Sequence, residues 1–171
     1  MTLGVGGLGA YALLREPALR LERPRGRDLA IGFGSAAALY GIFRLGDPMA
    51  RRIMPGGAGE IAGIYALRTA SSRPAIAAAL ALVIGPGEEL FWRGLIQHSL
   101  QRKFGRLRGM LMASSFYGGV HLVSKNLTLT GAAATAGLFW GALYAREGRL
   151  TPLIISHVTW DIWIFLVAPT G

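Results

Sequence analysis

Ionisable side chains recur inside apolar stretches in the second half of this 171-residue chain. A charge within a membrane-spanning helix costs about 2.5–3.5 kcal/mol on insertion scales, so such residues are candidates for function. They fall into three short patterns, whose members are Glu88, Glu89, Arg93, Tyr117, His121, His157 and Asp161. These patterns define the candidate site and the chemistry it could perform.

The first pattern pairs two adjacent carboxylates with one arginine. On a helix, Glu89 and Arg93 stand four residues apart and share a face, so Arg93 can neutralise Glu89. Glu88 points roughly 100° away and is free to face another helix. An unpaired carboxylate of this kind suits general-base work on water. The alternative is an ion pair that only fixes helix packing.

The second pattern combines an aromatic residue, two glycines and a histidine. Tyr117 and His121 are again four residues apart on one helical face. Gly118 and Gly119 between them allow another helix or a peptide to approach closely. The segment therefore predicts part of a substrate cavity, although a histidine by itself can equally be a packing residue.

The third pattern places His157 and Asp161 on one helical face. A carboxylate in this position can orient the imidazole ring and fix its tautomer. The competing interpretation is a buried hydrogen bond that ties the last helix to the bundle.

The composition indicates that these residues lie in a membrane protein. The chain is 52% hydrophobic and only 16% charged, with a mean hydropathy of +0.42, whereas soluble domains are about 25% charged. The net charge is +9, but the basic residues stand between apolar runs, as in membrane loops, so we expect no nucleic-acid partner. There is no cysteine, which excludes disulfides and thiolate metal ligands.

Apolar segments and helix breakers predict the elements. A stretch at 3–14 is apolar but short for a span, and Gly85-Pro86-Gly87 interrupts a long apolar run. The predicted helices are 29–45, 58–69, 75–100, 109–124, 127–145 and 151–168. The predicted loops 15–28, 101–108 and 146–149 hold eleven basic residues, against five in 46–73 and 124–126. This asymmetry predicts that the three basic loops are cytoplasmic.

These segments predict an all-α fold. We expect a polytopic transmembrane bundle of about five to six membrane helices, each about 20 residues long. Residues 1–74 would supply N-terminal membrane helices and basic loops, and residues 75–168 the core. The expected location is the cell membrane, with several passes. The frequent Arg, Ala and Gly suggest a bacterial source.

In order, the three patterns are Glu-Glu-x-x-x-Arg, aromatic-x-x-x-His and His-x-x-x-Asn/Asp. Together they resemble the CPBP family of intramembrane proteases, also called the CAAX-protease or bacteriocin-processing family, which includes the Rce1-type prenyl-protein proteases. The resemblance covers about residues 75–168. It implies membrane helices around a buried polar cavity. It also implies an endopeptidase that hydrolyses a peptide bond of a membrane-associated protein or peptide, with the lipid bilayer as its surroundings.

The resemblance also implies roles for individual residues. Glu88 and His121 would hold and deprotonate a water, and Glu89 with Arg93 would position the site. His157 and residue 161 would stabilise the oxyanion. Position 161 is Asp where many members have Asn, and an ionised Asp cannot donate a hydrogen bond. Asp161 is therefore either protonated or limited to orienting His157.

Three alternatives stay open at this point, the first being a zinc-dependent version of the same protease. No cofactor is expected, but Glu88, His121 and His157 with an open position could instead hold zinc. A second alternative is a non-catalytic membrane scaffold or immunity protein with the same fold. A third is a small transporter or proton relay built on the same acids and histidines.

Overall fold

The computed structural model describes residues 2–16 and 23–170, and every regular element in these residues is helical. The prediction of an all-α fold is confirmed. The α-helices are α1 (Thr2–Arg15), α2 (Gly26–Ile53), α3 (Gly57–Ala66), α4 (Arg73–Ala79), α5 (Gly85–Glu89), α6 (His98–Phe104), α7 (Arg106–Val120), α8 (Leu127–Glu147) and α9 (Thr151–Ile162). Between or after them lie π-helical segments (Leu80–Ile84, Leu90–Gln97, Trp163–Val167) and 3₁₀ segments (Leu67–Thr69, His121–Ser124).

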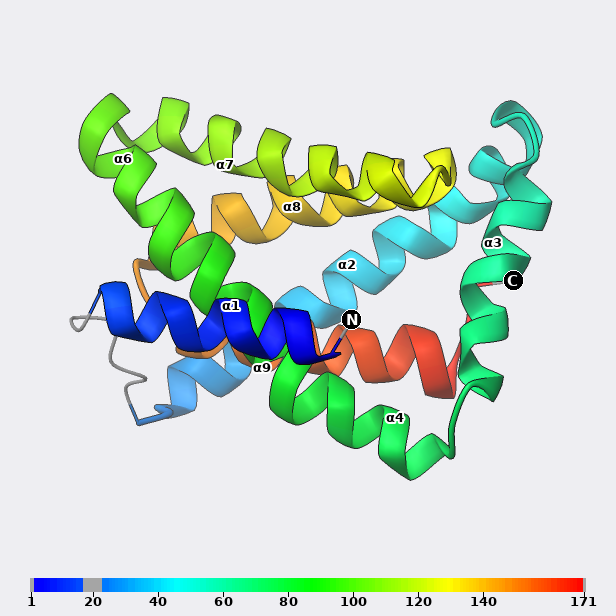
Figure 1. Ribbon diagram of the computed structural model, residues 1–171, viewed down its shortest axis with the longest axis horizontal. Helices are drawn as coiled ribbons and strands as arrows, with labels where there is room; N and C mark the ends of the chain where they lie inside the picture. The colour runs from blue at the N-terminus through cyan, green and yellow to red at the C-terminus, as the bar shows by residue number, and fades with distance from the viewer. Residues whose placement is uncertain (1, 17–22, 171) are drawn as a thin grey trace.

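The long helices run alternately between the two ends of the molecule. In Figure 1, α2, α7 and α9 run from the left end to the right end, while α8 and the continuous helix from α4 to α6 run back. The end of α1, the start of α2, the α6–α7 turn and the α8–α9 turn all lie at the left end. Consecutive segments are therefore antiparallel.

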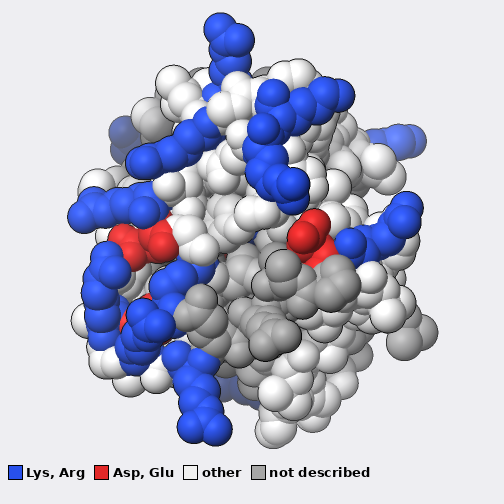
Figure 2. Space-filling view, turned by 90° about the vertical axis from the view of Figure 1, so that its left-hand side faces the viewer, with Lys and Arg blue, Asp and Glu red and all other residues white. Residues whose placement is uncertain are grey.

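Basic side chains gather at that left end. Figure 2 faces it and shows lysine and arginine side chains spread over its surface. The described parts of the predicted basic loops 15–28, 101–108 and 146–149 lie there (Figure 1), while residues 17–22, including Arg20, lie outside the described residues. The three segments that the sequence predicts to share one side of a membrane thus share one end of the fold.

Two helices of the described chain are long and apolar enough to cross a membrane. They are Gly26–Ile53 and the continuous helix Arg73–Phe104, each with a mean hydropathy of 1.4 in its most apolar window. The last apolar helix, Thr151–Val167, is shorter. Length and composition thus identify two such helices in the described residues. The expectation of five to six membrane helices stays a prediction.

The predicted helix 75–100 is confirmed, because the helix Arg73–Phe104 continues through Gly85-Pro86-Gly87. Proline lacks an N–H and its ring collides with the carbonyl four residues earlier. Just before Pro86 the chain forms a π-helical turn at Leu80–Ile84, where the Gly85 N–H donates to the Leu80 carbonyl five residues back. The widened turn accommodates Pro86 without ending the helix.

The two glycines beside Pro86 do not end the helix. They allow neighbouring helices to pack closely against it. A Cβ on Gly85 would lie 2.8 Å from Val158 of α9, and one on Gly87 would lie 2.9 Å from the Val5 carbonyl of α1. A Cβ on Gly9 of α1 would meet the Gly87 backbone at 2.8 Å. Small residues thus bring α1 and α9 against α5, which carries the two adjacent glutamates.

The expected loop 101–108 is wrong, since Gly105 alone separates α6 from α7. Gly105 has φ 85° and ψ 162°, a backbone conformation that is essentially restricted to glycine. A Cβ on Gly109 would meet the Gln101 amide nitrogen at 2.4 Å. The basic residues that suggested a loop therefore lie on two helices that meet in a tight hairpin.

Helix α2 is longer than the predicted 29–45 at both ends and passes through Pro48. It starts inside the predicted loop 15–28 because Asp28 caps it, accepting the Arg25 N–H at 2.9 Å. Arg149 donates to the same carboxylate at 2.8 Å. The predicted helix 58–69, by contrast, is confirmed almost residue for residue by α3 and the 3₁₀ turn after it.

The N-terminus of α8 is capped from another helix. Glu60 of α3 accepts the backbone N–H groups of Leu127 and Thr128, at 3.1 and 2.8 Å, and the Thr128 hydroxyl. Asn126 adds the local cap, accepting from the Leu129 N–H at 2.7 Å. These acceptors satisfy donors that a helix start leaves unpaired.

Glu60→Gln should lower the thermal unfolding temperature at pH 7, because glutamine keeps only one of the two acceptor oxygens and loses the charge. The Thr128 hydroxyl, with the Thr128 and Leu127 amides, holds the Glu60 pKa below its ordinary value of 4.5. The stabilisation is therefore complete above pH 4.5 and is lost as the pH falls through the lower folded-state pKa. Unfolding scans of both proteins from pH 7 to 3 should converge at the acid end. A constant gap over that range would contradict the capping role.

Gly105→Ala should destabilise the fold by about 1–3 kcal/mol, the cost of holding a non-glycine residue in this conformation. Denaturant unfolding in detergent micelles measures the change. Gly59→Ala is the matched control, because a Cβ there meets nothing within 4 Å and the site is helical. Equal stability of the Gly105→Ala variant and the wild type would contradict the account of the hairpin.

Candidate active site

The Glu89 carboxylate joins residues from two separate helices. Glu89 is fully buried, and its Oε1 accepts from the Arg93 guanidinium at 3.1 Å. The Nδ1 of His157 lies 2.7 Å from the same oxygen, and since a carboxylate oxygen only accepts, Nδ1 donates. The other oxygen, Oε2, has no hydrogen-bond partner among the described residues. Glu89 therefore ties α9 to the helix Arg73–Phe104.

Arg93 is enclosed by carbonyl and aromatic groups. It is 2% exposed and donates to the Gly137 carbonyl of α8 at 3.4 Å. Its guanidinium carbon lies 4.7 Å from the Tyr117 ring centroid and 5.7 Å from that of Trp140. Contacts with aromatic faces offset part of the cost of burying the cation. The ion pair predicted between Glu89 and Arg93 is present in the structure.

Glu88 faces a different helix from Glu89. Its Oε2 accepts from the Tyr117 hydroxyl of α7 at 2.7 Å. Tyr117 is 5% exposed, and its ring centroid lies 5.1 Å from that of His121. The first and second sequence patterns are thus joined through Tyr117.

His121 lies in the 3₁₀ turn that ends α7. Its Nδ1 lies 2.8 Å from the Tyr117 carbonyl oxygen. Because that oxygen can only accept, Nδ1 carries a proton, and in the neutral ring Nε2 keeps its lone pair. His121 is thereby oriented with a free nitrogen able to take a proton.

The role predicted for Asp161 as the orienting partner falls to Glu89 in the structure. His157 and Asp161 do share a face of α9, but the Nε2 of His157 lies 3.6 Å from Asp161 Oδ2, beyond hydrogen-bond distance. The 2.7 Å contact with Glu89 is the short one. Sequence spacing within one helix could not show a partner from another.

A residue that the sequence pattern left out of the site packs directly on His157. The Trp140 ring of α8 stacks on the imidazole with centroids 3.8 Å apart and planes 21° apart. Its indole N–H donates to Ser156 Oγ at 3.1 Å, and Trp140 is 1% exposed. The sequence indicates only a packing or interfacial role for Trp140. No spacing within the chain links it to His157.

The two glycines predicted to line a cavity have different surroundings. A Cβ on Gly118 would lie 3.0 Å from Ala134, so Gly118 lies at the contact between α7 and α8. A Cβ on Gly119 would meet nothing within 4 Å, and this residue is exposed. Only Gly119 has open space beside it, and the cavity-lining role of both glycines stays a prediction.

The space beside Arg93 and Tyr117 is tightly filled. The gap that they line with Trp92 and Gly137 has no room for a water molecule. The predicted buried polar cavity is not open at this position and stays a prediction. A pocket of about 400 Å³ lies elsewhere, between α2 and α8.

The six predicted catalytic residues divide into a buried and a partly exposed group. The buried ones, at most 3% exposed, are Glu89, Arg93 and His157. The partly exposed ones are Glu88, His121 and Asp161. The buried group can hold the site's geometry, while the other group can be reached by a reacting molecule.

The zinc alternative requires Glu88, His121 and His157 around one ion. The described residues contain no group of three His, Cys, Asp or Glu side chains placed to hold a metal ion. His157 already contacts Glu89 through Nδ1 and faces Asp161 with Nε2. This arrangement does not fit a three-residue zinc site.

Arg93→Met should destabilise the protein by about 3–5 kcal/mol, because it leaves the buried Glu89 charge without its cation. Arg102→Met, which removes an exposed arginine from α6, should change stability by less than about 0.5 kcal/mol. Thermal unfolding in detergent compares the two. Equal effects would mean that the buried ion pair does not organise the site.

One of three comparisons with known proteins finds a match. A family model described as type II CAAX prenyl endopeptidase Rce1-like matches residues 70–163. Neither the comparison with curated proteins nor that with solved structures yields a match. The matched region is more than half of the chain and contains all three sequence patterns. The chain therefore belongs to the Rce1-like family of membrane-embedded CAAX endopeptidases.

Proposed function

We propose that this protein is an intramembrane endopeptidase that hydrolyses a peptide bond of a membrane-associated protein or peptide by means of an activated water. The observation that carries the proposal is the position of Glu88. It is partly exposed, accepts a hydrogen bond from Tyr117, and lies next to a buried cluster of Glu89, Arg93 and His157.

In the proposed reaction, Glu88 and the Nε2 of His121 hold the water, and Glu88 takes its proton. The water oxygen then bonds to the scissile carbonyl carbon, and the carbonyl oxygen becomes an oxyanion. When the C–N bond breaks, the proton held by Glu88 passes to the leaving nitrogen. General-base catalysis of this kind contributes about 10²–10⁴-fold in rate.

His157 is proposed to stabilise the oxyanion. Glu89 fixes its Nδ1 side, and Trp140 fixes the plane of the ring. The Nε2 side faces Asp161, which is 14% exposed. Because Nδ1 already donates to Glu89, Nε2 can donate to an oxyanion only when the ring is doubly protonated, a form that the adjacent carboxylates favour. One well-placed donor contributes about 10²–10³-fold.

The proposed setting is the cell membrane, crossed by about five to six helices with the basic end of Figure 1 on the cytoplasmic side. The matched family is described as a CAAX prenyl endopeptidase, and a lipid-anchored substrate would present its peptide at the membrane. The scissile carbonyl must leave any helix, and only protein or water contacts can then satisfy the freed backbone groups. The open side of Gly119 offers room for such a strand.

Glu88→Gln should lower the cleavage rate of labelled membrane-anchored peptides by about 10²–10⁴-fold, because glutamine keeps the size and the Tyr117 contact but cannot take a proton. Glu16→Gln, outside the site, is the matched control and should cleave like the wild type. Each protein is assayed in detergent with and without a zinc chelator.

Each outcome of this assay discriminates between functions. Undiminished cleavage by Glu88→Gln contradicts the proposal. Loss of wild-type cleavage with chelator favours the zinc-dependent protease. If neither protein cleaves but both capture the same membrane partner, the scaffold function gains support, whereas ion-driven uptake into vesicles would support a transporter.

A further inference from the structure

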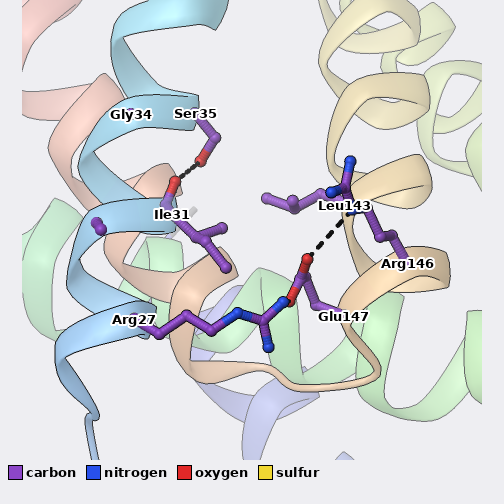
Figure 3. Close-up of a pocket in the computed structure, with 8 residues that line it drawn as sticks. Arg27, Ile31, Gly34, Ser35, Leu143, Arg146 and Glu147 are labelled. Atoms are coloured by element: carbon purple, nitrogen blue, oxygen red, sulfur yellow. Dashed lines mark hydrogen bonds and ion pairs between the residues drawn. The ribbon is translucent and has the colours of Figure 1, made fainter.

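A pocket of about 400 Å³ opens between α2 and α8, away from the candidate active site. Figure 3 shows Arg27, Ile31 and Ser35 on α2 across from Leu143 and Glu147 on α8. It lies at the end of the molecule where the basic residues gather, beside a helix long enough to cross a membrane. Nothing in the proposed reaction uses these residues.

Three charged side chains form the polar side of the pocket. The Glu147 side chain is 4% exposed and contacts Arg27 at 2.7 Å and Arg146 at 3.5 Å. The two arginine side chains are 70% and 81% exposed. Two cations share one carboxylate, so the group keeps a net charge of +1 and can accept a further anion.

The rest of the pocket is mostly apolar. Ala30, Ile31 and Leu143 line it together with Gly34, on which a Cβ would meet nothing within 4 Å. A small soluble anion would bury no apolar surface against this wall, whereas a hydrocarbon chain would do so favourably. The pocket therefore offers cationic groups at one side and an apolar surface beside them.

The deep side of the pocket is closed by hydrogen bonds between helices. The hydroxyls of Ser35 and Ser156 are 2.9 Å apart, and Ser156 accepts from the Trp140 indole. Trp140 in turn covers His157. The pocket and the candidate active site thus lie on opposite sides of this closed contact and are separate sites.

We propose that this pocket binds an anionic phospholipid. The phosphate contacts Arg27 and Arg146, and one acyl chain lies against Ile31, Gly34 and Leu143. Basic pockets between membrane helices on the cytoplasmic side are suited to anionic headgroups, which are abundant in that leaflet. This ligand matches both the charge of the pocket mouth and its apolar wall, and it does not depend on the proposed protease activity.

The test is a binding titration of the purified full chain in detergent, followed by native mass spectrometry. The probes are dioleoyl phosphatidylglycerol, dioleoyl phosphatidylcholine and soluble glycerol phosphate. The wild type should bind phosphatidylglycerol most tightly. The double variant Arg27→Gln/Arg146→Gln should weaken that binding about five-fold for each arginine removed. Arg106→Gln/Arg108→Gln, which removes two exposed arginines of α7, should leave it unchanged.

Two single variants distinguish a loss of lipid binding from a folding defect. Glu147→Gln removes the competing carboxylate and should tighten phosphatidylglycerol binding, an effect that a damaged fold would not give. Gly34→Leu fills the apolar side and should weaken binding of both dioleoyl lipids. Equal affinity for the two lipids, equal losses in both double variants, or glycerol phosphate bound as tightly as phosphatidylglycerol would each overturn the proposal.

Discussion

The buried carboxylate of Glu89 is the interaction on which the rest of this site depends. An ionised group with no exposure is costly unless it is paired, and here Arg93 and His157 both reach the same oxygen. The pairing fixes one side of the imidazole, places the arginine under the Tyr117 ring, and joins the third sequence pattern to the first. With Glu89 committed to this structural pairing, its neighbour Glu88 is the carboxylate left at an accessible position.

The helices that hold this cluster come close because small residues stand where they cross. Because Gly85 and Gly87 lack side chains, α9 and α1 pack closely against α5. Gly137 likewise leaves room for the Tyr117 ring, since a Cβ on Gly137 would lie 2.9 Å from that ring. The π-helical segments on either side of α5 also matter, because the second of them carries Arg93. Such local widening is common where a helix carries function. The first segment keeps Pro86 within the helix, and the second carries Arg93 at the site.

Much of the arrangement could be predicted from the sequence, for identifiable reasons. The all-α fold and the pairing of Glu89 with Arg93 follow from periodicity and from residues four apart on one helix. The family follows from the resemblance of the three patterns taken together. The one-residue turn at Gly105 could not be predicted, because clusters of arginine usually mark loops. The contacts of His157 with Glu89 and Trp140 join residues 68 and 17 positions apart. Spacing on a single helix carries no information about such partners.

The central claim is that Glu89 is sealed within the protein while Glu88 is accessible. An apolar carbodiimide, which reacts with accessible carboxyl groups, tests it directly on the folded wild-type protein in detergent. Tandem mass spectrometry of the peptide that contains both residues locates the adduct. The account predicts modification of Glu88, with Glu89 labelled only after unfolding. Labelling of Glu89 in the folded protein at the rate of Glu88, or faster, would contradict it.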